Sequence, residues 1–536
     1  MNNKTPSVLL ISLIAGNAIK IFEDMGIAYI ASYLRKKGCD VSIMREALAS
    51  IDIESIGKKE WNFIGFSVYD LNLPDVLAAA KKLKGYHSLK KSVFFAGGYT
   101  ATLDYKRLLQ GGAIDYIIMG EGELTAYDSI NALYKGNTLD NIPGVAYKAG
   151  KEIVVNPKRK FVEDLDSLPW PSRDLLMEKE YRVAIISSSR GCTGNCSFCV
   201  SKKYWGKWRG RSVKNTVDEM QYITQAYNIN NFYIIDCSLD DPGIPSGRLE
   251  SLMDEMIQRK LTIYFNAYMK ADFQRDATPL LIQKMKEAGL CGLMVGIESG
   301  NQDDLNLYNK AATVEDNYGI MDLLLKHEIA VTIGFIMFNP FSTYERLLKN
   351  IEFLDHYDLA YNIEYVVSGY IVYSGNSLND MIKKNGLWND AGGRFYSYTM
   401  KDKRIYTFAK YLLEYLQAIN SHTNDLLMRI QRYMIPFGYW SKVYEKNRLV
   451  KKILEDEKRS ISVIQKELSK TIVCLFKELL ELSMNGWSLE AADTVSRDIF
   501  SDDKLRNIAQ QFEFTRNRMY LKMERVGIDL NKCPFL

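Results

Sequence analysis

Strand-like and helix-like segments alternate along most of this chain, and this alternation limits the folds open to it. Between residues 1 and 145, apolar strand-like runs are separated by helical patterns. The runs are 7–14, 62–68, 92–96 and 115–119 with a weaker one at 41–44, and the helical patterns are 24–37, 73–84 and 123–134. Because parallel strands need helical crossovers, this order predicts an α/β fold with a doubly wound parallel sheet.

A second alternation begins at residue 183. Its strand-like runs are 183–188, 231–236, 262–267, 292–298, 330–338 and 361–368, with helical stretches between them. Six strands that alternate with helices predict a partial (β/α)6 barrel of the TIM type, whose active site lies at the carboxyl ends of the strands. From residue 402 onward only helical patterns remain. The predicted domains are 1–145, a proline-containing linker 146–182, the barrel 183–400 and a helical domain 401–536.

Three cysteines directly follow the first strand of the second alternation. Cys192, Cys196 and Cys199 have the spacing Cys-x3-Cys-x2-Cys, and the next cysteine, Cys237, is 38 residues away. Three thiolates can bind three irons of a [4Fe-4S] cluster, which leaves one iron open to a small molecule. A zinc site prefers four Cys or His ligands, and the loop contains no histidine. Zinc and a purely structural role remain the alternatives for this loop.

The cysteine spacing, with aromatic Phe198 before the last cysteine, resembles the radical S-adenosylmethionine (SAM) superfamily. The resemblance implies that SAM binds the open iron and is cleaved, on reduction, to a 5′-deoxyadenosyl radical that removes a substrate hydrogen. It places Phe198 near the SAM adenine and further SAM contacts at the other strand ends. The predicted SAM-binding residues are Phe198, Asp236, Gly296, Glu298, Ser299, Gly334 and Ile336. For Glu298 a structural ion pair is the alternative.

Glycine-rich loops follow three strands of the first alternation. Phe95–Thr102 and Ile114–Glu123 resemble the cobalamin-binding domain that precedes the barrel in a large radical SAM subfamily. The predicted cobalamin contacts are Ser67, Tyr69, Leu71, Gly97, Gly98, Gly120, Glu121 and Gly122. The Asp-x-His-x-x-Gly motif is absent and the loop 15–20 has no histidine, which fits a subfamily that binds cobalamin without a protein histidine. Tight turns without a ligand are the alternative, and no G-x-G-x-x-G indicates a dinucleotide site.

Some positions depart from the family pattern. Lys270 stands where an arginine is common, and Phe338–Thr343 lacks the glycines usual after the fifth strand. The basic stretch Arg209–Ser212 matches a common feature of the family. Its alternative interpretation is a helix start with Ser212 as N-cap.

The resemblance predicts a cobalamin-dependent radical SAM enzyme, with methyl transfer to an unactivated carbon of a natural product or peptide as the leading hypothesis. A cyclisation, ring contraction or oxidation without methyl transfer is the second hypothesis, and a corrinoid or Fe–S binding protein without turnover is the third. The expected partners are a small-molecule or peptide substrate and an electron donor of the flavodoxin or ferredoxin type.

Composition limits the location and the other partners. The net charge of +4 gives no indication of a nucleic-acid partner, and no apolar run reaches the length of a membrane span. Residues 8–14 resemble a signal-peptide core, but they are better explained as a buried first strand. Thiol ligands must stay reduced, so a cytoplasmic protein is expected.

Overall fold

The computed structural model describes residues 5–15, 22–178, 181–373, 375–389, 397–423, 425–433 and 435–528. Residues 16–20 of the loop 15–20 considered above lie outside the described residues. The contacts within the chain divide it into two compact units. The first consists of Met1–Thr193 and Val200–Cys237, and the second of Gly194–Cys199 and Ser238–Leu536. The four predicted domain ranges remain a prediction.

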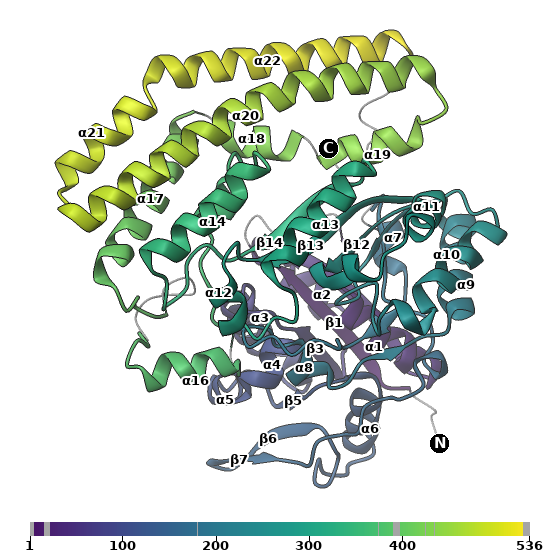
Figure 1. Cartoon of the computed structure of the whole chain (residues 1–536). Coiled ribbons are helices and arrows are strands. Elements are labelled where there is room, and N and C mark those ends of the chain that lie inside the picture. Colours follow the sequence, from purple (N-terminus) through teal and green to yellow (C-terminus); the bar gives the residue numbers. More distant parts are fainter. Residues whose placement is uncertain are drawn as a thin grey trace. The chain divides into compact units, whose positions relative to one another are not determined.

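The first unit contains the expected parallel sheet (Figure 1). Its strands are β1 (Ser7–Ile14), β2 (Asp40–Ala47), β3 (Phe63–Ser67), β4 (Val93–Gly97), β5 (Tyr116–Ile118), β6 (Val145–Ala149) and β7 (Glu152–Val155), in the spatial order β2-β1-β3-β4-β5-β6-β7. The first five run parallel, and the β6–β7 hairpin adds two antiparallel strands, formed by residues at the start of the predicted linker 146–182. The weak run at 41–44 is thus a true strand, β2.

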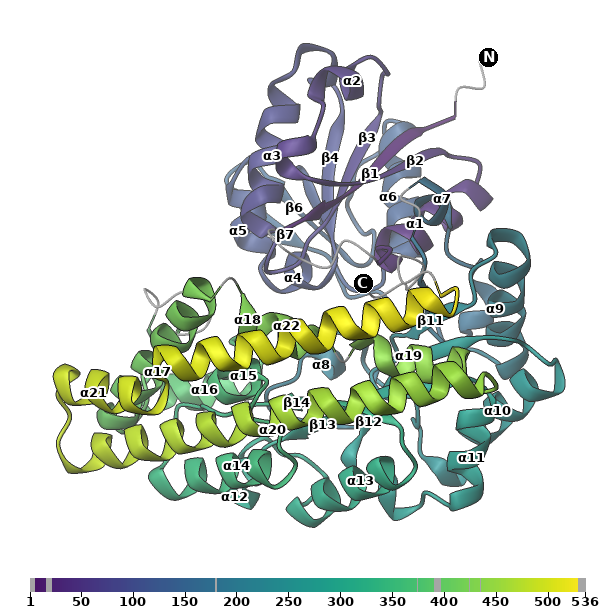
Figure 2. The same ribbon diagram turned by 90° about the horizontal axis from the view of Figure 1, so that it is seen from above.

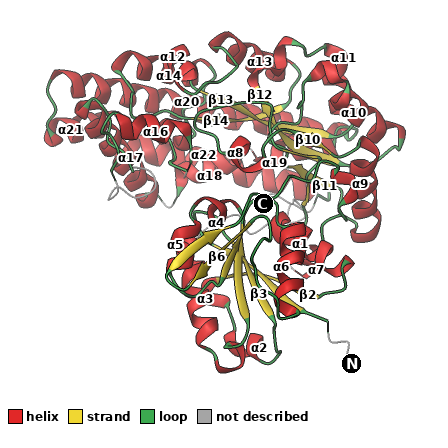
Figure 3. Cartoon of the chain, turned by 90° about the horizontal axis from the view of Figure 1, so that it is seen from below, coloured by secondary structure: helices red, strands yellow, loops and turns green. Residues whose placement is uncertain are grey.

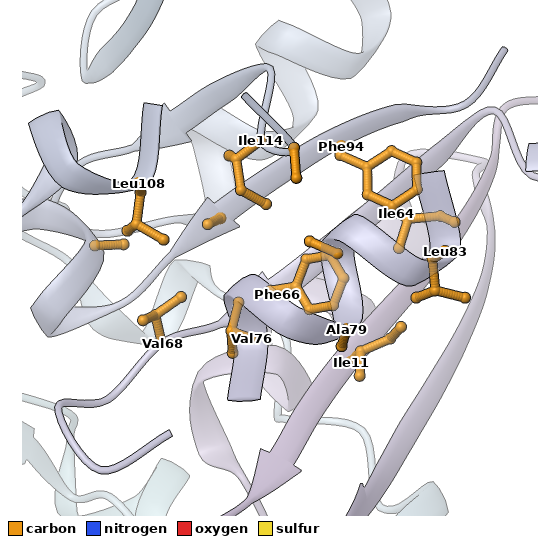
Figure 4. Close-up of a cluster of buried hydrophobic side chains, with 14 of the residues drawn as sticks. Ile11, Ile64, Phe66, Val68, Val76, Ala79, Leu83, Phe94, Leu108 and Ile114 are labelled. Atoms are coloured by element: carbon orange, nitrogen blue, oxygen red, sulfur yellow. The ribbon is translucent and has the colours of Figure 1, made fainter. Parts of the chain in front are cut away.

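Helices cover both faces of this sheet (Figures 2 and 3). They are α1 (Met25–Lys36), α2 (Ile53–Gly57), α3 (Leu73–Gly85), α4 (Tyr99–Leu103), α5 (Tyr105–Gln110) and α6 (Glu123–Tyr134). Apolar side chains of β1, β3 and β4 meet those of α3 in a buried core that includes Ile11, Phe66, Val76 and Phe94 (Figure 4). Burial of such side chains on both faces accounts for the nearly continuous apolar runs of the strands.

The remainder of the first unit leads into and out of the cysteine loop. Its elements are α7 (Asp174–Glu178), β8 (Ala184–Ile186), β9 (Ser189–Arg190), α8 (Ser201–Trp205), β10 (Arg209–Gly210), α9 (Val213–Tyr227) and β11 (Asn231–Ile234). β8 pairs in parallel with β11, and β9 pairs with β10 as a short antiparallel ribbon. Ser212 caps α9 by accepting a hydrogen bond from the Asn215 amide at 3.1 Å, which agrees with the alternative interpretation of the basic stretch as a helix start.

The second unit contains three parallel strands, β12 (Tyr264–Lys270), β13 (Leu290–Glu298) and β14 (Ala330–Phe335). The helices packed around them are α10 (Arg248–Gln258), α11 (Pro279–Glu287), α12 (Gln302–Leu307), α13 (Val314–Lys326) and α14 (Tyr344–His356). The predicted sixth strand, 361–368, is wrong, because this stretch forms helix α15 (Ile363–Val367). The Asn362 side chain caps that helix by accepting from the Glu364 amide at 3.1 Å, and this local hydrogen bond competes with an extended backbone.

The chain after the strands is helical, as predicted. Its helices are α16 (Ser377–Lys384), α17 (Lys403–His422), α18 (Leu426–Tyr433), α19 (Ile435–Val443), α20 (Arg448–Asn485), α21 (Leu489–Ile499) and α22 (Asp502–Arg525). The long helices α20 and α22 lie side by side (Figure 2). Between them the carboxylate of Glu457 is fully buried and receives hydrogen bonds from Arg518 and Lys522. Within the described part of the chain, no helix combines the length and apolar character of a membrane span.

Candidate active site

The carboxyl edge of the first sheet brings the predicted cobalamin residues together. β3, β4 and β5 are neighbouring parallel strands, so the loops that follow them leave the sheet at one edge. Ser67 ends β3 directly opposite Gly97, which ends β4. Gly120 follows β5, and its amide donates to Thr102 Oγ1 at 3.0 Å. In parallel α/β sheets this edge is where ligands bind.

Two large side chains after β3 are exposed at this edge. The Leu71 side chain is 62% exposed and Tyr69 is 41% exposed, although both flank a fully apolar core. The Tyr69 hydroxyl donates a hydrogen bond to Asp24; desolvation of this hydroxyl, whose ring remains partly exposed, together with that carboxylate raises the pKa of the phenol well above its ordinary value. Tyr69 is therefore a neutral donor at any physiological pH. An exposed leucine beside a tyrosine is a surface that a flat, largely apolar ligand would cover.

Gly98 is a position in these loops where both the backbone conformation and the close packing require glycine. Its φ is +99°, and a Cβ atom there would come within 3.1 Å of the Val68 carbonyl oxygen. Both facts follow from the tight passage from β4 into α4. Gly122, in contrast, packs against α1, since a Cβ atom there would meet Ile30 at 2.7 Å. The loop glycines thus serve close packing as well as an open edge.

Glu121 forms a buried ion network, which the sequence does not indicate. Its carboxylate accepts from Arg190 at 2.9 Å and from Arg209 at 3.0 Å, and Arg190 also donates to Glu123 at 2.5 Å. The four side chains are between 3% and 7% exposed. We call Glu121, Glu123, Arg190 and Arg209 the Arg190 network. Because the oxygens of Glu121 are engaged inside the protein, its structural role is to hold the strand that leads to the cysteines.

A second buried network lies in the same unit. Arg173 donates to Glu23 and to Glu219, each at 2.6 Å, and Arg211 donates to the other oxygen of Glu219 at 2.5 Å. We call these four residues the Arg173 network. Burial raises the pKa of Glu23 although Arg173 opposes the shift. Arg173 also donates to the Ile185 carbonyl at 3.0 Å, so this network supports β8.

The segment Ser187–Cys192, here named the front segment, is further held by Asp236. The Asp236 carboxylate is 2% exposed and accepts the amides of Ser188 at 2.7 Å and of Ser189 at 3.0 Å. The hydroxyls of both serines also donate to it. Asp236 is predicted from the sequence as a SAM contact. In the structure it anchors the backbone of the front segment instead of facing solvent.

Gly191 separates Arg190 from the first cysteine and is conformationally special. Its φ is +86°, and a Cβ atom there would lie 2.6 Å from the Lys207 carbonyl oxygen. Both observations result from the close approach of the chain beside the β9–β10 ribbon. Any larger residue would push the two sides of this ribbon apart.

The segment Asn195–Cys199, here named the back segment, belongs to the second unit and is held by neutral groups. The Asn195 carbonyl accepts from Asn309 at 2.8 Å, and the Phe198 carbonyl accepts from Asn376 at 2.6 Å. The Leu378 amide donates to the Ser197 carbonyl at 3.1 Å, and the Ser197 amide donates to the Tyr308 carbonyl at 2.8 Å. These hydrogen bonds fix the backbone of the back segment within the second unit.

Phe198 and Ser299 are connected through a buried polar network. The Phe198 ring packs edge-on against Tyr308 at 5.5 Å between centroids, and the Tyr308 hydroxyl accepts from Asn339 at 3.0 Å. Asn339 also donates to Asp304, whose other oxygen accepts from Ser299 at 3.2 Å. Ser299 is fully buried, and its single hydroxyl hydrogen is shared between Asp304 and the nearer Asn350 Oδ1, at 2.7 Å. Its hydroxyl is therefore used in holding the end of β13.

Glu298 occupies a strained position above two glycines. Its φ is +66°, at a break in the register between β13 and β14. Gly296 and Gly334 are paired across these strands, and Cβ atoms there would lie 2.8 Å and 3.4 Å from the Glu298 carboxylate. The carboxylate accepts from Lys310 at 3.0 Å, and the Ile336 amide donates to the Glu298 carbonyl at 2.8 Å. A strained backbone at a strand end is typical of functional sites.

Lys310 is a site residue that sequence reasoning does not identify. It is buried; burial lowers its pKa, but the Glu298 carboxylate beside it raises the pKa above the ordinary value. Burial also raises the pKa of the Cys196 thiol, and the Lys310 ammonium opposes that shift. Lys310 lies 12 residues beyond Glu298 with no recognisable motif. Only the fold brings the two side chains together.

The three cysteines fit an iron–sulfur cluster by the chemistry of their side chains. None forms a disulfide; Cys192 and Cys196 are half-buried, and Cys199 is exposed. Among the residues described, no three His, Cys, Asp or Glu side chains converge on one point, so this ligand set stays a prediction from the sequence. Three thiolates without histidine are the donors that an Fe–S cluster takes.

Comparison with known proteins decides the family. The B12 binding domain model matches residues 11–128, and the radical SAM superfamily model matches residues 186–354. The chain belongs to the cobalamin-binding radical SAM enzymes. The two domains confirm the expected cofactors: cobalamin for the first, and SAM with its [4Fe-4S] cluster for the second.

Relatives within this family differ in reaction. An uncharacterized methyltransferase of Pyrococcus horikoshii is 28% identical over 349 residues, 63% of this chain and 74% of that protein. The anaerobic magnesium-protoporphyrin IX monomethyl ester cyclase of Rubrivivax gelatinosus is 28% identical over 345 residues, 60% of each chain. The match thus spans less than two thirds of the cyclase.

The same architecture is known from a solved structure. The cobalamin-dependent S-adenosylmethionine radical enzyme OxsB, with aqua-cobalamin bound, matches with a TM-score of 0.70 at 20% identity. The match covers 99% of this chain and 81% of that one. It includes the helical C-terminal region, so the fold extends beyond the two domain models.

Proposed function

We propose that this radical SAM enzyme transfers a methyl group to an unactivated carbon of a natural product or peptide. The observation that carries the proposal is the carboxyl edge of β3, β4 and β5. There, exposed Leu71 and Tyr69 adjoin glycine loops in a chain that also contains the cysteine triplet. When bound, the cluster with SAM supplies a radical that removes a substrate hydrogen, and cobalamin supplies the methyl group.

The residues of this chain would bind and orient these groups. Cys192, Cys196 and Cys199 would hold the cluster, while Leu71 and Tyr69 would lie against the corrin. Gly97, Gly98 and Gly120 would let the ligand approach the loop backbone closely.

Charged and aromatic groups would position SAM. The buried pair Glu298–Lys310 offers a carboxylate and an ammonium to the amino acid part or the ribose of SAM. Phe198, fixed by its contact with Tyr308, offers an aromatic face for the adenine. Ser299 and Asp236, whose polar atoms are engaged within the protein, would act by keeping β13 and the front segment in place.

Methyl-labelled SAM tests this proposal without a known substrate. The chain is purified and reconstituted without oxygen, then incubated with labelled SAM, cobalamin and a one-electron reductant. We expect label to co-elute with cobalamin and 5′-deoxyadenosine to form. Label that never leaves SAM while 5′-deoxyadenosine forms would contradict methyl transfer. Absence of both products would favour a binding protein without turnover.

A second function is supported by the similarity to an anaerobic cyclase. In this alternative the same cofactors would produce a cyclisation, ring contraction or oxidation without methyl transfer. Fold and cofactors are shared between the two reactions, so the site geometry fits both. The alternative would be established by a reaction in which SAM is cleaved to 5′-deoxyadenosine and the product contains a new ring but no label.

Two further parts of the proposal concern the surroundings of the enzyme. Cluster reduction requires an external one-electron donor, for which a flavodoxin- or ferredoxin-type protein is proposed. The thiol ligands require a reducing compartment, for which the cytoplasm is proposed. Reconstitution with either carrier protein in place of a chemical reductant would test the first point.

A further inference from the structure

The Arg190 network joins the loop at the corrinoid edge to β9, the strand that ends two residues before the first cysteine of the triplet. Arg190 and Arg209 are directly opposite each other on the β9–β10 ribbon. Two like charges in such a cross-strand pair repel each other. Glu121 stands between them and accepts from both, at 2.9 Å and 3.0 Å. The ribbon therefore depends on a carboxylate that the loop after β5 supplies.

Because the network is buried, no solvent group can take the place of the Glu121 carboxylate between the two arginines. Glu121 and Glu123 are 5% exposed on their side chains, Arg190 is 7% and Arg209 is 3% exposed. Water cannot replace a missing partner there, and an unpaired buried charge is costly. A movement of the loop Gly120–Glu123 must consequently move the guanidinium groups, or break the pairs.

The network keeps one unused acceptor. Glu123 accepts from Arg190 through Oε1, while its Oε2 is buried and has no hydrogen-bond partner in the structure. A buried carboxylate oxygen without a partner favours a rearrangement that would satisfy it. The network is thus balanced in charge but incomplete in hydrogen bonding.

A further contact links the same loop to the chain beyond the cysteines. The Tyr204 hydroxyl, from α8, donates to the Gly120 carbonyl at 3.1 Å. The Tyr204 ring packs edge-on against Tyr99, which follows Gly98 after β4, at 5.7 Å between centroids. Both corrinoid-edge loops therefore contact segments that border the cysteine loop.

We infer that the Arg190 network couples occupancy of the corrinoid edge to the state of the cysteine loop. Arg190 would be a positioning residue, because it acts through Glu121 and Glu123 on one side and Gly191 on the other. The inference rests on the proposed cobalamin edge. By linkage, the factor by which the iron–sulfur cluster changes cobalamin affinity equals the factor by which cobalamin changes cluster affinity.

The test is a pair of cobalamin titrations on the full chain. Hydroxocobalamin is titrated by visible absorbance into protein with reconstituted iron and into protein stripped of iron. The ratio of the two dissociation constants measures the coupling. We expect a ratio of roughly 5 to 150, the usual size of such couplings. In the wild-type protein, cobalamin should also change the EPR spectrum of the reduced cluster.

Arg190→Lys should bring this ratio close to one, because lysine keeps the charge but cannot bind two carboxylates in a planar fork. Arg173→Lys is the matched control. Arg173 is equally buried and also bridges two carboxylates, but its network contains no residue of the corrinoid edge. The control should lose a similar amount of stability and keep the coupling. If Arg190→Lys does not fold, Glu123→Gln, which removes one charge at nearly constant shape, replaces it.

Three outcomes overturn the inference. A wild-type ratio near one does so while leaving cobalamin binding intact. Equal ratios in the wild-type protein and in Arg190→Lys do so as well. If the wild-type protein binds no cobalamin, both the inference and the proposed function fail, and this result is distinguishable from the first two.

Discussion

The front and back segments of the cysteine loop are held by opposite kinds of interaction. The front segment, Ser187–Cys192, depends on buried charges. Asp236 binds its backbone, and Glu121 and Glu123 bind the side chain of its Arg190. The back segment, Asn195–Cys199, depends on neutral amide groups that bind its carbonyls. Removing one partner of a buried ion pair leaves the other charge buried without compensation, which is strongly destabilising. Removing one neutral hydrogen bond costs much less, because no buried charge is left behind. We therefore expect substitutions that affect the front segment to lower the free energy of unfolding more than substitutions that affect the back segment.

The largest effect of all is expected for the cysteines, because their loss removes the cluster whichever segment they belong to. Cys196→Ala should remove the iron and abolish 5′-deoxyadenosine formation, because a cluster with two protein thiolates is not retained. Iron analysis and product chromatography after anaerobic reconstitution are the measurements. Cys474→Ala, an exposed cysteine on α20, should keep full iron content. Equal iron loss in both variants would contradict the assigned ligand set.

The largest effect on stability is expected for the front network. Arg209→Met should lower the free energy of unfolding by about 3–5 kcal/mol, because it removes a partner of buried Glu121. Denaturant unfolding measures this change. Arg35→Met breaks a partly exposed pair with Asp174 in the same unit and should cost at most about 1 kcal/mol. Similar losses in the two variants would show that burial does not set the strength of the front network.

The next largest loss of stability is expected for a change at Gly191, which alters the backbone of the front segment. Gly191→Ala should cost about 2–3 kcal/mol, because it adds a clash with the Lys207 carbonyl to an unfavourable φ. Gly112→Ala shares the positive φ, +71° against +86°, but has open space around its Cβ position. The difference between the two unfolding free energies isolates the clash. No difference would mean that the ribbon opens without cost.

The smallest loss of stability is expected for substitutions that affect the back segment. Asn376→Ala should cost about 1–2 kcal/mol, since it removes hydrogen bonds to the Phe198 carbonyl and to Tyr370 while Asn309 and Leu378 still hold the loop. Asn385→Ala, an exposed site with only a local hydrogen bond, serves as the control in thermal unfolding. A loss as large as that of Arg209→Met would remove the distinction between the two segments.

Much of the fold follows from local patterns, and the exceptions have local causes. The runs of β1, β3 and β4 are nearly continuously apolar because both faces of their sheet are buried, so their strand character is readable from the sequence. The run 361–368 interrupts its apolar residues with Asn362 and Glu364 and forms α15, which Asn362 caps. A capping hydrogen bond of one side chain is too weak a signal to predict against an apolar run.

The candidate site is less predictable than the fold. The positions of Gly98 and Leu71 at the carboxyl edge follow from strand order alone. Glu121 and Asp236 are at the expected strand ends, yet their carboxylates bind the protein itself. Ligand-binding and structural carboxylates have the same residue type at the same place in a strand. Only their partners distinguish them, and those partners are far away in the sequence.

The sequence by itself determined the chemistry of this protein: three thiols at a family spacing, glycine loops after parallel strands, and a helical C-terminal region. These are local features, since spacing and periodicity involve residues that are near each other along the chain. The tertiary structure alone decided how the chemistry is supported. Arg190 meets Glu121 across 69 positions, and Asn376 meets Phe198 across 178. Such contacts leave no local pattern, because burial and charge balance depend on which segments the fold brings together.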